Sequence, residues 1–320
     1  MLAIRVHDHG GPEVLRYEDV RIPTPGPGEM RIHVEAIGVN FIDVYHRKGL
    51  YPVERPYVPG GEAAGVVREI GPGVTGFGIG DRVVSMHVKG AYAELALVPA
   101  DKCVRIPQGV STKQAAAVML QGITAHYLSH STYPLKASDR ALVLAAAGGV
   151  GLLLCQMAKK RGAFVIGVAS SPEKRALAKG AGADDVIDYD DFPLSVRTIT
   201  RHERVHVVYD SVGRTTFEQS LDCLVPRGMM VLFGQSSGPV PPVDPQILNR
   251  KGSLFLTRPT TTHYLATRDE LLWRANDVLG WVKDGSLTVR IGAEFSLADA
   301  ANAHRALEGR ETTGKVLLKI

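Results

Sequence analysis

A glycine-rich segment in the middle of the chain has the residue types and the position of a phosphate-binding loop. It lies between a predicted buried strand, Ala141–Ala145, and a predicted helix, Val150–Arg161, and reads Ala145-Ala146-Ala147-Gly148-Gly149-Val150-Gly151. Glycines let the backbone approach a pyrophosphate, and the N-terminus of the helix presents free N–H groups and a positive dipole. The first glycine of the usual fingerprint is an alanine here, and a tight structural turn is the alternative interpretation. We predict a dinucleotide-binding loop.

The end of the next predicted strand, Phe164–Val168, indicates which dinucleotide is bound. Enzymes that use NAD usually carry Asp or Glu at this point, where it binds the ribose 2′-OH. Here Ala169-Ser170-Ser171 contains no carboxylate, and Lys174 and Arg175 follow. Hydroxyl groups and cations suit a 2′-phosphate. An ordinary solvated helix start, with Glu173 near the N-terminus, is the alternative. We therefore predict NADPH rather than NADH.

These residues must be positioned by two different kinds of structure. In the first third of the chain, short apolar runs are separated by Gly/Pro turns, which is typical of a small β-barrel or sandwich. From Arg140 onward strands and helices alternate, which predicts a doubly wound α/β domain with a parallel sheet. The tail from Thr267 has no phosphate loop of its own. We therefore expect one domain of residues 1–124 completed by 267–320, and a second of residues 125–266.

Composition narrows the class of protein further. The 320 residues carry 37 basic and 33 acidic side chains, and a net charge of +4 is too small to argue for nucleic-acid binding. Three cysteines, Cys103, Cys155 and Cys223, are far apart and odd in number, which favours a reducing compartment. No apolar run reaches the roughly 18 residues of a membrane span, and Met1–His9 lacks a signal-peptide core. We expect a soluble, cytoplasmic protein.

Short motifs at ordered positions along the whole chain resemble those of one enzyme family. They are His9–Leu15, Asn40–Tyr45, Gly49–Pro52, Pro59–Gly65, Gly80–Val83, Gln121–Ala125, Ala147–Gly151, Tyr209–Gly213, Phe233–Gly238 and Thr257–Pro259. Each motif is short, but their order and spacing together are specific. On these residues the chain resembles the quinone oxidoreductases of the medium-chain dehydrogenase/reductase superfamily, a family that includes zeta-crystallin.

The resemblance implies a GroES-like β-rich N-terminal domain, a Rossmann domain and an active-site cleft between them. It implies that the nicotinamide and quinone side is lined by Asn40, Asp43, Tyr45 and Tyr51. It implies that the phosphates are held by Thr124, Gly148, Gly149, Val150 and Gly151, and the 2′-phosphate by Ser171, Lys174 and Tyr189. The remaining cofactor contacts that it implies are Ser211, Phe233, Gly234, Gln235, Leu256, Thr257, Arg258 and Lys315. For the three tyrosines, ordinary packing is the alternative.

The zinc-binding residues of related alcohol dehydrogenases are missing. Asn40 stands where those enzymes carry the first cysteine ligand, and Gly60-Gly61-Glu62 replaces their Gly-His-Glu. Between Val83 and Val104 only Cys103 occurs, so the four-cysteine structural site is absent too. Zinc needs about three such protein ligands. We expect no metal, a structural role for Glu62, and packing or surface roles for the histidines.

The activity implied by the resemblance is reduction of quinones by NADPH. Without a Lewis acid a simple ketone is hard to reduce, whereas the product anion of a quinone is delocalised. Catalysis would then be mainly positioning, with Tyr45 or Tyr51 donating a hydrogen bond to the quinone oxygen. The alternatives are a 2-alkenal or enoyl reductase of the same superfamily and, more remotely, an NADPH-binding RNA-binding or structural protein. Family members commonly form homodimers, for which Val243–Leu256 offers an edge segment.

Overall fold

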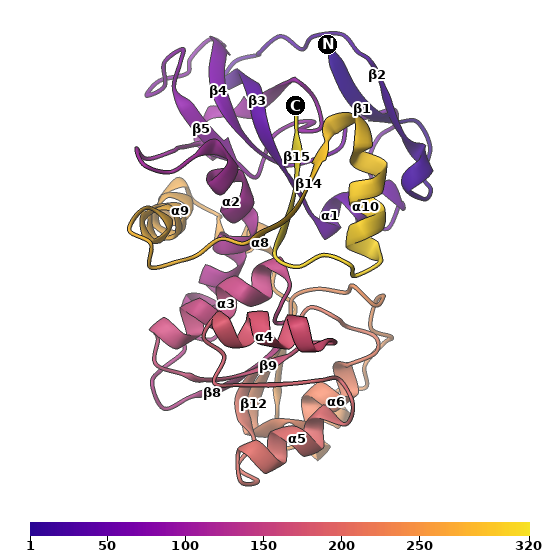
Figure 1. The fold of residues 1–320 in the computed structure, drawn as a ribbon, viewed down its shortest axis with the longest axis vertical. Coiled ribbons are helices and arrows are strands. Elements are labelled where there is room, and N and C mark those ends of the chain that lie inside the picture. Colours follow the sequence, from indigo (N-terminus) through magenta and orange to yellow (C-terminus); the bar gives the residue numbers. More distant parts are fainter. The chain divides into compact units, whose positions relative to one another are not determined.

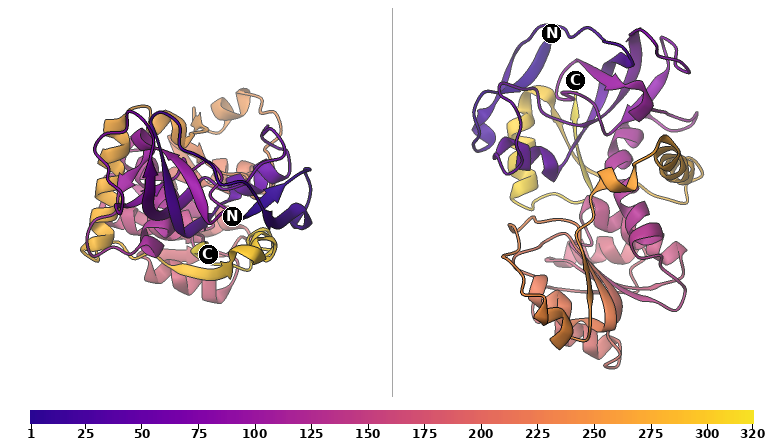
Figure 2. Two further views of the ribbon diagram at one scale, coloured as in Figure 1. Left: turned by 90° about the horizontal axis from the view of Figure 1, so that it is seen from above. Right: turned by 180° about the vertical axis from the view of Figure 1, so that it is seen from behind.

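The computed structural model describes all residues from Met1 to Ile320 (Figure 1). The chain forms two compact units: one contains residues 1–121 and 267–320, and the other contains residues 122–266. The C-terminal strands return to the unit that holds the N-terminus, as Figure 2 shows. None of the helices combines the length and the apolar character needed to cross a membrane.

The first unit is built on β-sheets. Its strands are β1 (Leu2–Val6), β2 (Leu15–Asp19), β3 (Glu29–Val39), β4 (Glu62–Ile70), β5 (Arg82–Ser85), β6 (Leu95–Pro99), β7 (Val104–Arg105), β14 (Ile291–Ser296) and β15 (Lys315–Lys319). The larger sheet has the order β14-β15-β3-β4-β5-β7, with β6 also paired to β3, and β1 and β2 form a separate antiparallel pair. Alternating apolar side chains of β3, such as Met30, Ile32 and Val34, point into a core that also contains Val316 and Leu318 of β15.

Three helices belong wholly to this unit: α1 (Phe41–Arg47), α9 (Arg268–Lys283) and α10 (Ala300–Glu308). Capping boxes fix the start of two of them. In α9 the Thr267 side chain accepts from the backbone N–H of Glu270, whose carboxylate accepts from the N–H of Thr267. In α1 the same reciprocal arrangement joins Asn40 and Asp43. The helix α2 (Thr112–Tyr127) follows β7 and ends in a π-helical turn, Leu128–Thr132.

The second unit has a six-stranded sheet in which every pair is parallel. Its strands are β8 (Arg140–Leu144), β9 (Phe164–Val168), β10 (Asp185–Ile187), β11 (Val205–Asp210), β12 (Leu224–Leu232) and β13 (Phe255–Thr257). Its helices are α3 (Gly149–Lys160), α4 (Pro172–Gly180), α5 (Phe192–Ile199), α6 (Phe217–Asp222), α7 (Gln246–Arg250) and α8 (Thr261–Tyr264). The strand order β10-β9-β8-β11-β12-β13 is that of a Rossmann fold. The predicted fold class is therefore confirmed.

This strand order locates the ligand crevice of the second unit. The chain starts at β8, runs outward through β9 and β10, and then returns to the other side of β8 at β11. In open α/β sheets, ligands bind outside the carboxyl ends of the strands at this switch point. The segments after β8, β9, β10, β11 and β12 therefore form the candidate cofactor surface of this unit.

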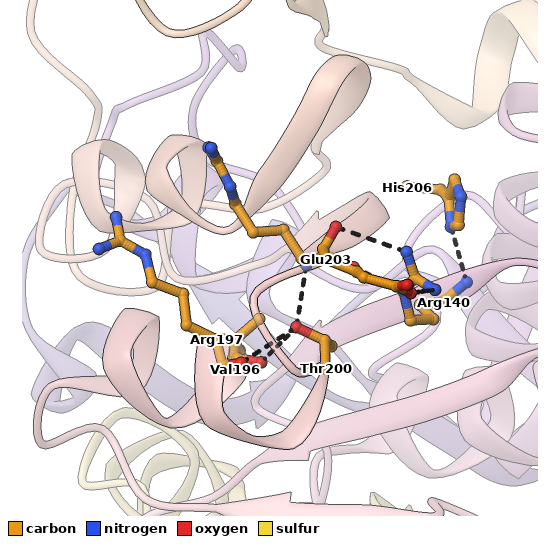
Figure 3. Close-up of polar contacts among 7 residues, drawn as sticks. Arg140, Val196, Arg197, Thr200, Glu203 and His206 are labelled. Carbon is orange, nitrogen blue, oxygen red and sulfur yellow. Dashed lines mark hydrogen bonds and ion pairs between the residues drawn. The ribbon is translucent and has the colours of Figure 1, made fainter.

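The opposite, amino-terminal end of the sheet is held by a strained loop before β11 (Figure 3). Arg201, His202 and Arg204 adopt left-handed φ values of 51°, 68° and 59°. The hydroxyl of Thr200 accepts from the N–H of Arg204 and donates to the carbonyl of Val196, at 2.9 and 2.7 Å. These contacts fix the entry into β11, the strand that leads to the cofactor surface.

Arg140, at the start of β8, ties that strand to the same loop (Figure 3). Its guanidinium donates to the carbonyl of Arg204 at 2.6 Å and forms an ion pair of 2.7 Å with Glu203. Its backbone N–H donates to Nδ1 of His206 at 2.9 Å. His206 thus serves the alignment of β8 with β11, in keeping with the packing role expected for it.

Candidate active site

The glycine-rich loop joins β8 to α3 as predicted and packs tightly against the strand. A Cβ atom at Gly151 would lie 2.3 Å from the carbonyl oxygen of Ala145, so only glycine fits there. Gly148 is the N-cap of α3, and Gly149 and Val150 occupy its first turn. The N-terminus of this 12-residue helix can accept an anion, since no side chain caps it.

Ala146 stands at the position of the first fingerprint glycine, and the residue before it, Ala145, has a left-handed conformation. Its φ of 51° lies in the left-handed region that glycine normally occupies. The N–H of Ala145 donates to the hydroxyl of Tyr189 at 2.9 Å, which supports this turn. Because Tyr189 follows β10, the contact places this tyrosine directly beside the phosphate loop.

The residues expected around the 2′-phosphate lie at the ends of two adjacent strands, β9 and β10. Ser171 is the N-cap of α4, and its hydroxyl accepts from the N–H of Lys174 at 3.3 Å. Arg175 is close to Asp188, with 3.9 Å between the guanidinium and the carboxylate. Ser171, Lys174 and Tyr189 are thus brought to one corner of the sheet, where no carboxylate ends β9 itself.

A buried aspartate on the other side of the switch point organises the loop after β11. Oδ1 of Asp210 accepts from the N–H groups of Val212 and Gly213, at 2.7 and 3.0 Å. Oδ2 accepts from the hydroxyls of Thr216 and Ser220, at 2.7 and 3.0 Å. With all these partners, the carboxylate fixes the turn that carries Ser211.

The loop after β12 lies directly against that turn. A Cβ atom at Gly234 would lie 2.6 Å from the carbonyl oxygen of Ser211, so this glycine permits the contact. Phe233 donates its N–H to the carbonyl of Asp210 at 2.9 Å. The structure therefore brings together the predicted residues Ser211, Phe233, Gly234 and Gln235. Sequence reasoning missed Asp210, although an aspartate ending a buried strand with hydroxyl residues six and ten positions later is a readable signal.

Thr124 belongs to a small polar cluster around a buried tyrosine. The Tyr127 hydroxyl is hydrogen bonded to the side chains of Thr124 and Thr261, and burial raises the pKa of Tyr127 to about 12. The Tyr127 ring stacks on Tyr264 with 4.4 Å between ring centroids. Sequence reasoning missed Tyr127 as the residue that holds Thr124. The other predicted contacts, Leu256, Thr257 and Arg258, lie at or just after the edge strand β13.

In the first unit, Asn40 and Lys315 form part of a fully buried polar network. Nζ of Lys315 donates to Oδ1 of Asn40 at 2.7 Å and to Oε2 of Glu62 at 2.5 Å. Nδ2 of Asn40 donates to the same Glu62 oxygen at 2.9 Å. The N–H of Leu120 donates to the other Glu62 oxygen at 2.5 Å. Lys315 and Glu62 are therefore a buried ion pair with additional hydrogen bonds, and Glu62 has the structural role expected from the sequence.

Asp43 continues this network along α1. Its Oδ2 accepts from the N–H of Asn40 at 2.9 Å and from the hydroxyl of Tyr92 at 3.2 Å. Burial raises the pKa of Asp43 to about 7, against the hydrogen bonds and the charge of Lys315, which lower it. Four residues were expected to line the catalytic side. For two of them, Asn40 and Asp43, the hydrogen-bond partners in the structure are other protein groups.

Tyr45 and Tyr51 instead form an aromatic cluster with Phe41 and His46. The rings of Tyr45 and Tyr51 meet edge to face with centroids 5.8 Å apart. The ring centroid of Phe41 lies 6.2 Å from that of Tyr45, and the ring centroid of His46 lies 6.2 Å from that of Tyr51. Tyr51 is 36% exposed and neighbours the exposed Leu50. This cluster offers a planar substrate both ring contacts and phenolic donors.

No group of three or more His, Cys, Asp or Glu side chains in the structure is close enough together to hold a metal ion. The three cysteines are buried free thiols, and burial raises the pKa of both Cys103 and Cys155 to about 12. Beside Asn40 and Glu62 the positive charge is provided by the ammonium group of Lys315.

Comparisons with known proteins agree with this architecture. Residues 26–108 match the family described as alcohol dehydrogenase GroES-like domain, and residues 149–267 match the zinc-binding dehydrogenase family. The chain is 47% identical to a quinone oxidoreductase of Pseudomonas aeruginosa, with 97% of each chain covered. It is 42% identical to a 2-haloacrylate reductase of a Burkholderia species, covering 99% of this chain and 98% of that one.

Solved structures give the same result. The quinone oxidoreductase of Escherichia coli in complex with NADPH superposes with a TM-score of 0.98 at 44% identity, with both chains fully covered. A mycobacterial protein, also in complex with NADPH, gives a TM-score of 0.98 at 49% identity over both full chains. With its Rossmann unit, its GroES-like unit and these relatives, the chain belongs to the quinone oxidoreductase family of the medium-chain dehydrogenase/reductase superfamily.

Proposed function

We propose that the protein is a zinc-independent NADPH:quinone oxidoreductase. The aromatic cluster of Phe41, Tyr45, His46 and Tyr51 is the observation that carries this proposal, because it provides ring contacts and phenolic donors for a flat diketone. Relatives at 47% and 45% identity that are named quinone oxidoreductases support it.

The second unit fits NADPH through its own residues. The N-terminus of α3 with Gly148, Gly149 and Val150 would hold the pyrophosphate, and Gly151 allows the close approach of helix and strand. Ser171, Lys174 and Tyr189 would surround the 2′-phosphate. The Asp210-supported turn with Ser211, and Phe233 to Gln235 beside it, would lie along the cofactor. When bound, NADPH supplies the reducing equivalents.

In this mechanism the residues of the chain orient the quinone and supply a hydrogen bond, and none needs to be an obligatory acid. Tyr45 or Tyr51 donates to a quinone oxygen and so stabilises negative charge that develops there. The delocalised product anion needs less stabilisation than an alkoxide, so positioning accounts for most of the rate. Zinc independence is supported by Lys315, since an ammonium group already satisfies Glu62 and Asn40 and would repel a second cation.

A second candidate function is reduction of an activated carbon–carbon double bond. It is favoured by the 42% identity to a 2-haloacrylate reductase. A substrate panel separates the two: NADPH oxidation is followed with phenanthrenequinone, benzoquinone, 2-alkenals and 2-chloroacrylate. Quinone turnover at least roughly 10-fold above that of the other substrates in kcat/KM, about 1.4 kcal/mol of discrimination, is the expected result. A preference for the alkenals or 2-chloroacrylate would assign the protein to the double-bond reductases.

We also infer that the protein is a homodimer that associates through the exposed edge strand β13. Phe255, at its start, is 58% exposed, and the outer edge of β13 has no partner strand in the chain. A Phe255→Lys variant should become monomeric in sedimentation equilibrium at micromolar concentration. A wild-type protein that is already monomeric would contradict the inference. The buried free thiols are compatible with a cytoplasmic location.

A further inference from the structure

A continuous chain of hydrogen bonds ties the C-terminal helix α10 to both ends of α1. Nη1 of Arg47 lies 2.9 Å from Nδ1 of His304, and Nε2 of His304 lies 3.0 Å from the hydroxyl of Tyr92. That hydroxyl donates to Oδ2 of Asp43 at 3.2 Å. His304 and Arg47 are completely buried, as is Tyr92. Asp43 belongs to the first turn of α1 and Arg47 to its last turn.

The donors and acceptors along this chain allow only one direction. A guanidinium can only donate, so Nδ1 of His304 must accept and the ring proton must lie on Nε2. Nε2–H then donates to Tyr92, whose own proton goes to Asp43. The imidazole is therefore neutral, in keeping with its pKa, which burial and the neighbouring Arg47 charge lower to about 3.

These contacts determine how α1 is rotated about its axis. Asp43 and Arg47 are four residues apart and so share one face of the helix, while Phe41 and Tyr45 share the opposite face. A helix of seven residues is too short to be stable alone, so its orientation depends on such tertiary contacts. A second anchor holds Arg47 in place: its Nη2 pairs with Glu308 of α10 at 2.7 Å, and Lys48 pairs with the same carboxylate.

We propose that His304 is a positioning residue for the aromatic cluster. By holding Asp43 through Tyr92 at one end of α1 and Arg47 at the other, it fixes the rotation of the helix that presents Tyr45 toward Tyr51. The inference rests on the proposed function for what these tyrosines do, namely orient the quinone. It assigns no contact between His304 and any ligand.

Four variants test the proposal. His304→Leu removes both hydrogen bonds, whereas His304→Gln keeps one acceptor and one donor on a planar group. Tyr92→Phe removes only the linking hydroxyl. Leu307→Ala is the matched control, because Leu307 packs against the core from the same helix but takes no part in the chain. For each variant, kcat/KM for phenanthrenequinone at saturating NADPH, the Kd for NADPH and the amide exchange of residues 41–47 are measured.

His304→Leu and Tyr92→Phe should each lower kcat/KM for the quinone roughly 10-fold through misplacement of the tyrosines. The double variant His304→Leu/Tyr92→Phe should have a kcat/KM no more than about twofold below that of the poorer single variant, because both changes break the same chain of hydrogen bonds. His304→Gln and Leu307→Ala should stay within about threefold of the wild type, and the Kd for NADPH should change by less than about twofold. The proposal is overturned if His304→Leu behaves like the wild type, or if Leu307→Ala is impaired to the same extent.

Failure of the proposed function gives a different result. If the wild type oxidises no NADPH with any quinone, that function is wrong, and amide exchange alone decides the structural part of the inference. Faster exchange of residues 41–47 in His304→Leu and Tyr92→Phe, but not in Leu307→Ala, would uphold the positioning of α1. Unchanged exchange in all variants would overturn it.

Discussion

Individual side chains in this protein divide into those proposed to bind ligands and those that hold other side chains in place. Lys174 stands in the first turn of α4, at the proposed 2′-phosphate site, while Asp210 and Glu62 use both of their carboxylate oxygens to accept hydrogen bonds from protein donors. Charged residues that are fully buried are rarely tolerated without such partners. Substitutions in the first group should therefore change ligand binding, and substitutions in the second group should change the free energy of unfolding.

The first prediction concerns cofactor selectivity. A charge-assisted hydrogen bond to a phosphate contributes about 1.5–3 kcal/mol, so Lys174→Ala should weaken NADPH binding roughly 10- to 100-fold. NADH binding should barely change. Lys179→Ala, at the other end of the same helix, is the control and should affect neither cofactor. Equal weakening of NADPH and NADH, measured by fluorescence titration, would show that the 2′-phosphate lies elsewhere.

The second prediction concerns the buried ion pair. Lys315→Met leaves Glu62 buried without its counter-charge and should lower the free energy of unfolding by about 3–5 kcal/mol. The double variant Lys315→Met/Glu62→Gln removes both charges and should recover at least half of that loss, as measured by urea denaturation. A double variant as unstable as Lys315→Met would mean that Lys315 stabilises through packing rather than charge.

At the scale of elements, the strand–loop–helix unit β8–α3 depends on close packing. Sequence analysis predicted both elements and the loop, because glycine spacing between a buried strand and a helix is a strong local signal. It gave no indication that Ala145 would adopt a left-handed φ, since that conformation is held by a contact with Tyr189 from a different strand. Likewise α1 was not predicted within the β-rich third, because its stability comes from buried partners far along the chain.

The third prediction tests this packing directly. In Gly151→Ala the new methyl group would lie 2.3 Å from the Ala145 carbonyl oxygen, so α3 must move away from the strand. Overpacking of this kind costs about 1–3 kcal/mol and should also weaken NADPH binding, whereas Gly180→Ala has open space and should be neutral or slightly stabilising. Calorimetry and cofactor titration measure both effects. Normal cofactor affinity in Gly151→Ala would contradict the proposed pyrophosphate site.

At the scale of the whole molecule, the two-unit architecture and the family were predictable from the sequence, because motifs recur in order along the entire chain. The contacts made by the residues expected on the catalytic side were predictable only in part. Tyr45 and Tyr51 meet in one cluster, but the partners of Asp43 are Tyr92 and, through it, His304, more than 200 positions away. No local pattern reports such a contact; only the fold brings these residues together.

The fourth prediction is a pH dependence of global stability. Burial and the neighbouring Arg47 charge lower the pKa of His304 to about 3 in the folded protein, from an ordinary value of 6.5. Between pH 3 and pH 6.5 the unfolded chain binds a proton at His304 that the folded protein does not. The stability that the neutral, buried imidazole allows is therefore fully present above pH 6.5 and is lost as the pH falls below it.

Comparison with His304→Gln isolates this group, because other titrating residues cancel. The stability advantage of the wild type over the variant should shrink by about 2 kcal/mol between pH 7 and pH 5, as measured by urea denaturation at the two pH values. An advantage that stays constant would show that His304 is protonated in the folded state, and the hydrogen-bond direction inferred from Arg47 to Asp43 would then be wrong.

We propose that this chain reduces quinones with NADPH and without a metal. The most direct measurement is NADPH oxidation by chelator-treated, metal-analysed protein with phenanthrenequinone, repeated with NADH and with added zinc. We expect turnover that needs no metal, is unaffected by zinc and is faster with NADPH than with NADH. Turnover that appears only when zinc is restored, or no turnover of any quinone alongside tight NADPH binding, would contradict it.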